Sequence, residues 1–296
     1  MNASATNVTP ITRDVAGFHT RLNAFNADRF KPGRVTDHWE CDTRDVLSLF
    51  LEEGRFLENE RAAVASIAAT APSDADGFMH WFTALNGHGP GQNDPLFPWL
   101  AERADYEEMR WFLKQEVAGE AGFEDLVALT QVRFPSGPKL EMARNYWDEM
   151  GRGHERGMHG GMLEDSASEF NLSALATEDL WEALALGNLM AGLASNRRYA
   201  YQSVGALGVI EMTAPGRVSL VNQGLIRLGV SAKGRQYFQL HAGLDIRHSE
   251  AWNREVIRPL VAADGSLARS IAEGALMRLR AGERCFSRYR AELGLN

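Results

Sequence analysis

The sequence lacks the features that mark secreted, membrane-spanning or thiolate-zinc proteins. Its first residues, MNASATNVTPITRD, contain no basic region followed by an apolar run, and no apolar stretch approaches the roughly 18 residues of a membrane span. The two cysteines, Cys41 and Cys285, lie far apart and form no CxxC pattern. We therefore expect no signal peptide, no thiolate metal site and a cytoplasmic location.

Basic residues are also in short supply. Lysine and arginine number 31 against 39 acidic residues, which gives a formal net charge of −8 for the 296-residue chain. An acidic surface does not attract a phosphate backbone or anionic lipid, so we expect neither a nucleic-acid nor a membrane partner. The 45% share of hydrophobic residues is that of a globular protein with a sizeable core.

Strand patterns are scarce as well. Few segments alternate apolar and polar residues, whereas apolar residues three and four positions apart recur, as in the segment 43–71 with Val46, Leu49 and Phe56. The chain shows no fixed-period repeat and no composition shift that would mark a linker. The sequence therefore predicts an all-α fold, a helical bundle of seven or more helices.

Glycine and proline place the expected breaks between helices. The segment GHGPGQNDPLFP at 87–98 predicts a loop. Helical spacing predicts helices over 106–131, 177–193 and 196–212, the last ended by Pro215, which cannot continue a helical hydrogen-bond ladder. We expect an N-terminal arm over 1–35 and a single helical-bundle domain over 36–296 that carries the functional site.

The most informative pattern is His241-Ala-Gly-Leu-Asp245-Ile-Arg-His248. Each helical residue advances by about 100°, so these three side chains leave one helix face within about 60°. Imidazole nitrogens and a carboxylate oxygen are ligands for iron, manganese or zinc. The same residues could form a solvated face or a buried polar network, and three ligands alone leave a metal half-coordinated.

Three further residues could complete such a site. Glu211 lies in the apolar segment GALGVIEM, where a carboxylate is costly unless it is paired, binds a metal or reaches water at a helix end. Glu116 lies in WFLKQE, and could equally be a surface charge. His159 lies in NYWDEMGRGHERGMHGGM, whose five glycines each weaken a helix by about 1 kcal/mol relative to alanine. A stretch with that cost is typical of a functional site.

With these elements in the order WFLKQE, NYWDEMGRGHERGMH, GALGVIEM and HAGLDIRH, residues 111–248 resemble the haem-oxygenase-like diiron oxidases and oxygenases, often described as iron-containing redox enzymes. The resemblance implies a bundle that binds two iron ions and no haem, with dioxygen as co-substrate. It implies catalytic, metal-binding roles for Glu116, His159, Glu211, His241, Asp245 and His248.

The resemblance also implies the kind of reaction and the partners. Family members oxidise amines, amino acids or fatty acids through N-oxygenation, carbon–carbon cleavage or decarboxylation. We therefore expect a small-molecule substrate, and with it an electron donor and a homodimer.

One further ligand is left open between two glutamates. Some family members carry an additional glutamate on the second core helix, and Glu149 aligns best with it. Glu149 lies ten residues before His159, so in a regular helix their side chains would point about 80° apart around the axis. Glu155 lies only four residues before His159, which brings the two side chains closer to the same helix face. We favour Glu149 and assume a helical irregularity among the glycines.

Other classes of protein would use the same residues differently. A helical iron-storage protein could hold iron on these ligands without turning over an organic substrate. A thiaminase-type enzyme would need a cysteine nucleophile, but Cys41 and Cys285 are distant in sequence from the His and Glu residues. A structural protein with a buried polar network would bind no metal at all.

Overall fold

The structure is a computed structural model that describes residues 14–35, 39–120 and 122–295, so the first residues of the predicted arm lie outside it. The described chain folds into helices and contains no strand, which confirms the predicted all-α bundle. The α-helices are α1 Val15–Arg29, α2 Trp39–Ala68, α3 Ala75–His88, α4 Leu96–Glu102, α5 Tyr106–Gly119, α6 Phe123–Thr130, α7 Ser136–Glu149, α8 His159–Glu169, α9 Trp181–Ser195, α10 Ala200–Arg227, α11 Gln236–Trp252, α12 Arg258–Ala263 and α13 Leu267–Glu292.

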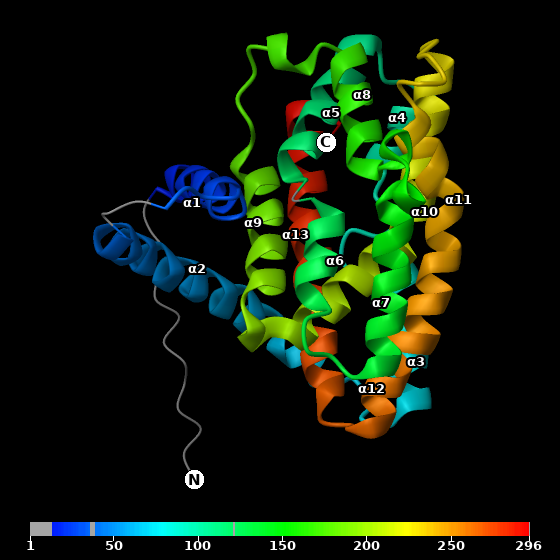
Figure 1. Cartoon of the computed structure of the whole chain (residues 1–296). Coiled ribbons are helices and arrows are strands. Elements are labelled where there is room, and N and C mark those ends of the chain that lie inside the picture. Colours follow the sequence, from blue (N-terminus) through cyan, green and yellow to red (C-terminus); the bar gives the residue numbers. More distant parts are fainter. Residues whose placement is uncertain (1–13, 36–38, 121, 296) are drawn as a thin grey trace.

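Helix α10 is the central helix of the bundle and packs against α4, α11 and α13 (Figure 1). Its contact with α13 requires glycine on both helices. A Cβ atom on residue 205 would clash with the carbonyl oxygen of Ile271, and one on residue 274 would clash with that of Gln202. The two backbones therefore approach closely and bury the apolar residues between them.

The sequence predicts that Pro215 ends its helix, and this prediction is wrong. Helix α10 continues through Pro215 to Arg227. Proline removes the hydrogen bond to the carbonyl of Glu211, at a typical cost of about 3 kcal/mol. Packing offsets that cost, because Gly224, beyond the proline, lies against the backbone of Leu100.

The segment Arg197–Arg227 is long and apolar enough to cross a membrane by composition alone. Its most apolar window is 56% buried within the bundle. Packing against α4, α11 and α13 therefore accounts for this composition.

The predicted helix over 106–131 is two helices, α5 and α6. Gly122 adopts φ 72°, a left-handed conformation that ends helical hydrogen bonding and that glycine adopts at little cost. Two other predicted boundaries also differ: α4 begins at Leu96 inside the predicted loop, and α9 begins at Trp181 rather than near residue 177. The break before α6 turns both α5 and α6 toward the cavity described below.

Part of the predicted N-terminal arm is a packed helix. Helix α1 lies beside α9 (Figure 1), with Phe18 and Leu22 each 1% exposed. The side chain of Asn26 donates to Asn188 Oδ1 at 2.8 Å, and His19 stacks on Trp181. The segment 15–29 therefore belongs to the folded body, while the boundary at residue 35 stays a prediction.

We expect the docking of α1 to weaken in acid because of His19. Burial, with a smaller contribution from Arg284, lowers the pKa of His19 from 6.5 to about 4. The unfolded chain therefore binds a proton at His19 more readily than the folded chain does. The stability that docking of the neutral His19 ring contributes is complete above pH 6.5 and is lost as pH falls toward 4. The loss should reach at most about 3 kcal/mol. Urea unfolding across this window should show a smaller pH slope for His19→Gln. Equal slopes for both proteins would contradict this account.

Candidate metal centre

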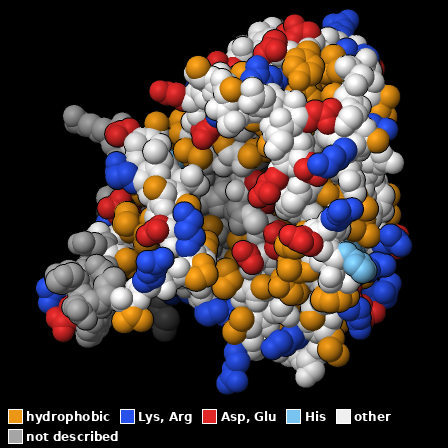
Figure 2. Space-filling model, turned by 45° about the horizontal axis from the view of Figure 1, so that its top comes forward, with side chains coloured by type: hydrophobic (Ala, Val, Ile, Leu, Met, Phe, Trp, Pro, Cys, Tyr) orange, Lys and Arg blue, Asp and Glu red, His pale blue; other side chains and the backbone are white. Residues whose placement is uncertain are grey.

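A cavity of about 190 Å³ lies among helices α4 to α11 and α13. The predicted residues that line it are Glu116, Glu149, His159, Glu211, His241 and Asp245. His248 lies beside this lining, 7% exposed, with its Nδ1 atom 3.5 Å from Glu211 Oε2. Figure 2 shows a hollow near the centre of the visible face, with acidic side chains gathered around it.

The glycine-rich segment between α7 and α8 brings Glu149 to His159. Helix α7 ends at Glu149, and Gly151, Arg152 and Gly153 then adopt φ values of 61°, 54° and 83°. An isolated antiparallel bridge joins Met150 to Met158 and closes this loop. As a result Glu149 Oε2 lies 2.7 Å from His159 Nδ1, although ten residues separate them.

Of the two glutamates left open by the sequence, Glu149 is the one that the structure brings into the cluster. It is 3% exposed. Glu155 lies in a short 3₁₀ turn and is exposed. The helical irregularity expected among the glycines is therefore present, and it removes the geometric objection to Glu149.

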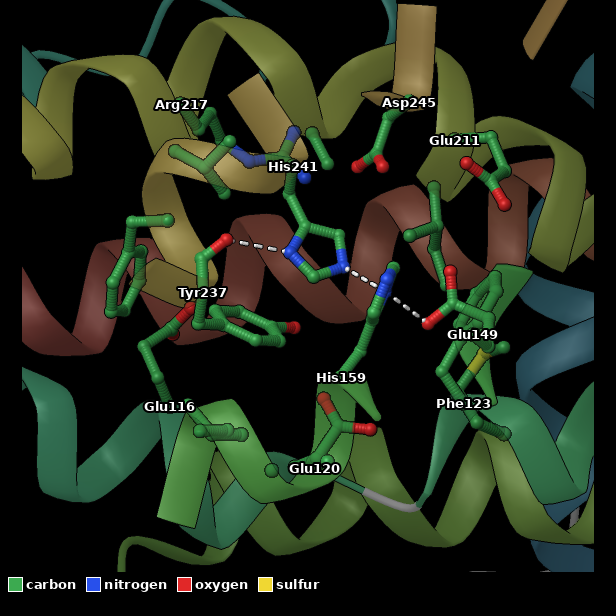
Figure 3. A pocket seen from close by; sticks show the side chains of 18 of the residues that line it. Glu116, Glu120, Phe123, Glu149, His159, Glu211, Arg217, Tyr237, His241 and Asp245 are labelled. Atoms are coloured by element: carbon green, nitrogen blue, oxygen red, sulfur yellow. Dashed lines mark hydrogen bonds and ion pairs between the residues drawn. The ribbon is translucent and has the colours of Figure 1, made fainter. Parts of the chain in front are cut away.

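Helix α11 presents His241, Asp245 and His248 on one buried face, as their spacing predicts. The Nδ1 atom of His241 lies 2.7 Å from the carbonyl oxygen of Tyr237. Because a carbonyl only accepts, His241 must carry its proton on Nδ1, which leaves the Nε2 lone pair free to bind a metal. That Nε2 atom lies 3.0 Å from His159 Nδ1 (Figure 3).

The ligand atoms form two groups that share one residue. Atoms of Glu149, His159 and His241 lie within 4.8 Å of one another, and so do atoms of Glu149, Glu211 and His248. Each group offers carboxylate and imidazole donors, the set that suits iron. Glu149 belongs to both groups, so one carboxylate lies between two places where a metal ion could be held.

Neighbouring side chains that the sequence did not single out orient these ligands. Asn145 donates to Glu211 Oε1 at 2.5 Å. Asp148 Oδ2 accepts from His248 Nε2 at 3.2 Å, which leaves Nδ1 of that ring facing Glu211. Arg152 in turn pairs with Asp148 at 2.6 Å. No local sequence pattern marked Asn145 or Asp148 for this role.

The cluster is short of positive charge. Burial raises the pKa of Asp245 to about 9, and the charges of Glu211 and Glu149 add to this rise. Burial also raises the pKa of Glu149. For His248, contacts with Glu211, Asp148 and Glu149 outweigh burial and raise the pKa to about 9. A divalent cation would supply the missing charge and displace these protons.

Two atoms within the cluster support the fit of a metal. Asp245 Oδ1 and His248 Nδ1 are buried and have no hydrogen-bond partner among the described residues. Buried polar atoms are almost always hydrogen-bonded, and metal coordination is one way to satisfy them. The residues present therefore fit a bound metal, with carboxylate oxygens and imidazole nitrogens as donors.

Glu116 does not join either group, in contrast to the ligand role that the resemblance implies. It lines the cavity near Arg217 and Arg278, whose positive charges act on it. Burial raises the pKa of Glu116 to about 7. In Figure 3 Glu116 lies on the Tyr237 side of His241, while Glu149 and Glu211 lie on the other side.

An all-helical bundle that gathers buried carboxylates and imidazoles from several helices defines the class of helical carboxylate metalloproteins. The sequence profile of the iron-containing redox enzyme family matches residues 110–283, and the chain belongs to this family. The predicted resemblance is thereby confirmed, together with the haem-oxygenase-like fold. Comparison with curated proteins gave no match.

We expect Gly151→Ala to lower iron binding. An alanine at φ 61° is strained by about 1–2 kcal/mol, and its Cβ would clash with the Gly157 carbonyl, so Glu149 would shift away from His159. Iron content per chain after reconstitution measures the effect. Gly161→Ala is the matched control, because nothing lies within 4 Å of its Cβ position, and it should keep full iron content. Equal iron binding by both variants would contradict this role of the loop.

Proposed function

We propose that this protein is a non-haem diiron oxidoreductase that activates dioxygen to oxidise a small organic substrate. The observation that carries the proposal is the shared position of Glu149, which belongs to both groups of buried donor atoms. Two ferrous ions bound there would supply the electrons with which dioxygen is reduced. The substrate would be an amine, an amino acid or a fatty-acid-like molecule, altered by N-oxygenation, carbon–carbon cleavage or decarboxylation.

The two groups suggest how the iron ions would be held. Glu149, His159 and His241 would hold one ion. Glu149, Glu211 and His248 would hold the other, with Asp245 beside them, because the charges of Glu149 and Glu211 both act on its carboxyl group. Carboxylate bridging between two metal ions is a recurring arrangement in helical bundles.

The protein's own side chains would position these ligands and exclude water. The Tyr237 carbonyl fixes the tautomer of His241, and Asp148 orients the ring of His248. The five donor residues of the two groups, and Asp245, are each less than 9% exposed. Such burial strengthens electrostatic interactions and limits competition from solvent.

An iron-storage protein could use the same ligands, but the walls of the cavity favour an enzyme. Apolar side chains, including Met190, Ile210 and Phe238, line the space next to the donor atoms. An apolar space with a few polar groups is typical of organic ligand sites, whereas stored iron has no need of it.

The site does not favour a thiaminase-type enzyme, which would need a reactive cysteine in the cavity. Burial raises the pKa of the Cys285 thiol to about 12, so it stays protonated and unreactive. Cys285 also lies outside the residues that line the cavity. The side chain of Cys41 lies outside the described part of the chain.

An electron donor, a homodimer and a cytoplasmic location remain part of the proposal. An electron donor would return the iron ions to the ferrous state after each turnover. Each of these expectations rests on the resemblance or on cysteine usage.

We expect anaerobic titration of the metal-free protein with ferrous iron to saturate near two ions per chain. Glu149→Gln should weaken both binding events by about 10-fold or more, because the shared carboxylate is lost, whereas Glu211→Gln should weaken mainly one. Glu155→Gln, at the exposed glutamate of the same segment, should bind like wild type. Saturation at one ion, or equal effects of Glu149→Gln and Glu155→Gln, would refute the diiron assignment.

Mixing the loaded protein with dissolved dioxygen separates the enzyme from a storage protein. An oxidase should consume dioxygen at a rate that depends on added amines, amino acids or fatty acids. A storage protein should consume dioxygen in proportion to iron, whatever organic compound is present.

A further inference from the structure

Two partly buried arginines line the same cavity as the metal-binding candidates. Arg217 lies on α10 and Arg278 on α13. Arg217 follows Glu211 by six residues, which places it about 9 Å further along the helix axis. In Figure 3 Arg217 lies on the Tyr237 side of the cavity, away from Glu149 and Glu211. The cavity therefore has an acidic end and a basic end.

Within the described residues, Arg217 and Arg278 form no ion pair, and Arg278 Nε is buried without a hydrogen-bond partner. Arg217 instead lies over the rings of Phe97 and Phe286, 5.9 and 5.5 Å from their centroids. Aromatic rings stabilise a guanidinium, but they do not use its hydrogen-bond donors.

The two arginines also act on each other. Burial lowers the pKa of Arg217 to about 10, and the positive charge of Arg278 lowers it further. The negative charge of Glu116 raises the pKa of Arg217 and so opposes both effects. Two carboxylates act on Arg278 in the same direction: Glu116 and, more weakly, the exposed Glu120. One carboxylate for two guanidiniums leaves at least one positive charge without compensation. Such a charge is costly unless a ligand pairs with it.

We propose that Arg217 and Arg278 bind the carboxylate of the organic substrate, so that the substrate is a monocarboxylic acid whose chain points toward Glu149 and His241. This inference rests on the proposed function of the cavity. A single negative charge matches the surplus at the arginines, whereas a dianionic phosphate would exceed it. Apolar side chains that line the same cavity, including Leu186, Met190 and Ile210, would contact the chain of the acid.

The separation of the arginines from the metal-binding candidates favours some of the proposed reactions over others. A carboxylate held by the arginines lies away from the metal-binding candidates, and the far end of the molecule lies next to them. Oxidation at a position remote from the carboxylate therefore fits this geometry better than decarboxylation does. A bidentate guanidinium–carboxylate contact would also fix the register of the chain in the cavity.

The test measures binding of butyrate, hexanoate, octanoate and decanoate to the full chain by calorimetry, both metal-free and anaerobically loaded with ferrous iron. Arg217→Gln and Arg278→Gln should each weaken binding of the best acid by about 10- to 100-fold, in both states. Arg280→Gln is the matched control, since Arg280 lies on the same helix, half a turn away, and pairs with Glu60 outside the cavity. It should bind the acid like wild type. Both cavity variants should stay folded, because each removes a charge that has no ion-pair partner, and thermal unfolding checks this.

Ligand analogues decide what the arginines recognise. The alcohol of the same chain length should bind weakly to wild type and should be insensitive to either arginine variant. Tighter binding of the alkyl phosphate than of the carboxylate would overturn the monocarboxylate assignment. Equal binding of acid and alcohol, or no loss in either variant, would overturn the proposal.

The outcomes also separate this proposal from the diiron proposal. Glu149→Gln should lose iron but keep carboxylate binding, since Glu149 lies at the other end of the cavity. Carboxylate binding without iron binding would refute the diiron function alone. Two iron ions with no arginine-dependent carboxylate binding would refute this inference alone.

Discussion

The crowding of buried carboxylates is the constraint on which the rest of this structure depends. Glu149, Glu211 and Asp245 lie together with little access to water, where like charges repel strongly and hydration is lost. Hydrogen bonds relieve part of this cost, as when Asn145 donates to Glu211. Hydrogen bonds do not supply the positive charge that would balance the carboxylates, whereas a divalent cation would supply it. The protein therefore maintains, within an otherwise apolar bundle, a cluster whose stability is coupled to metal binding.

The loop between α7 and α8 shows what this cluster costs in local structure. A continuous helix would hold Glu149 and His159 on different faces. The chain instead leaves the helix through left-handed residues, one of which, Arg152, is not glycine and is strained there. Strain of this kind persists only where surrounding contacts impose it, and here the Met150–Met158 bridge and the Arg152–Asp148 ion pair do so.

Sequence reasoning captured what depends on helical spacing and missed what depends on packing. The face shared by His241, Asp245 and His248 follows from a fixed rotation per residue, so it could be predicted. The continuation of α10 through Pro215 could not, because contacts with α4 and α13 outweigh a local preference. The partners Asn145 and Asp148 and the basic end of the cavity come from helices whose relative positions no local pattern encodes. The resemblance implied a ligand role for Glu116, whereas in the structure it lines the cavity where the charges of Arg217 and Arg278 act on it.

The position of Glu116 gives the cavity its polarity. With Glu116 absent, two guanidiniums would face one another in an apolar space, and their repulsion would raise the cost of keeping both charged. With a second carboxylate as close as Glu116, the basic end would be neutral and would offer nothing to an anion. One carboxylate near two arginines offsets part of their charge and leaves at least one positive charge to be matched. The acidic end needs cations and the basic end needs one anion, so the two ends favour opposite ligands and would orient a molecule that carries charge at one terminus.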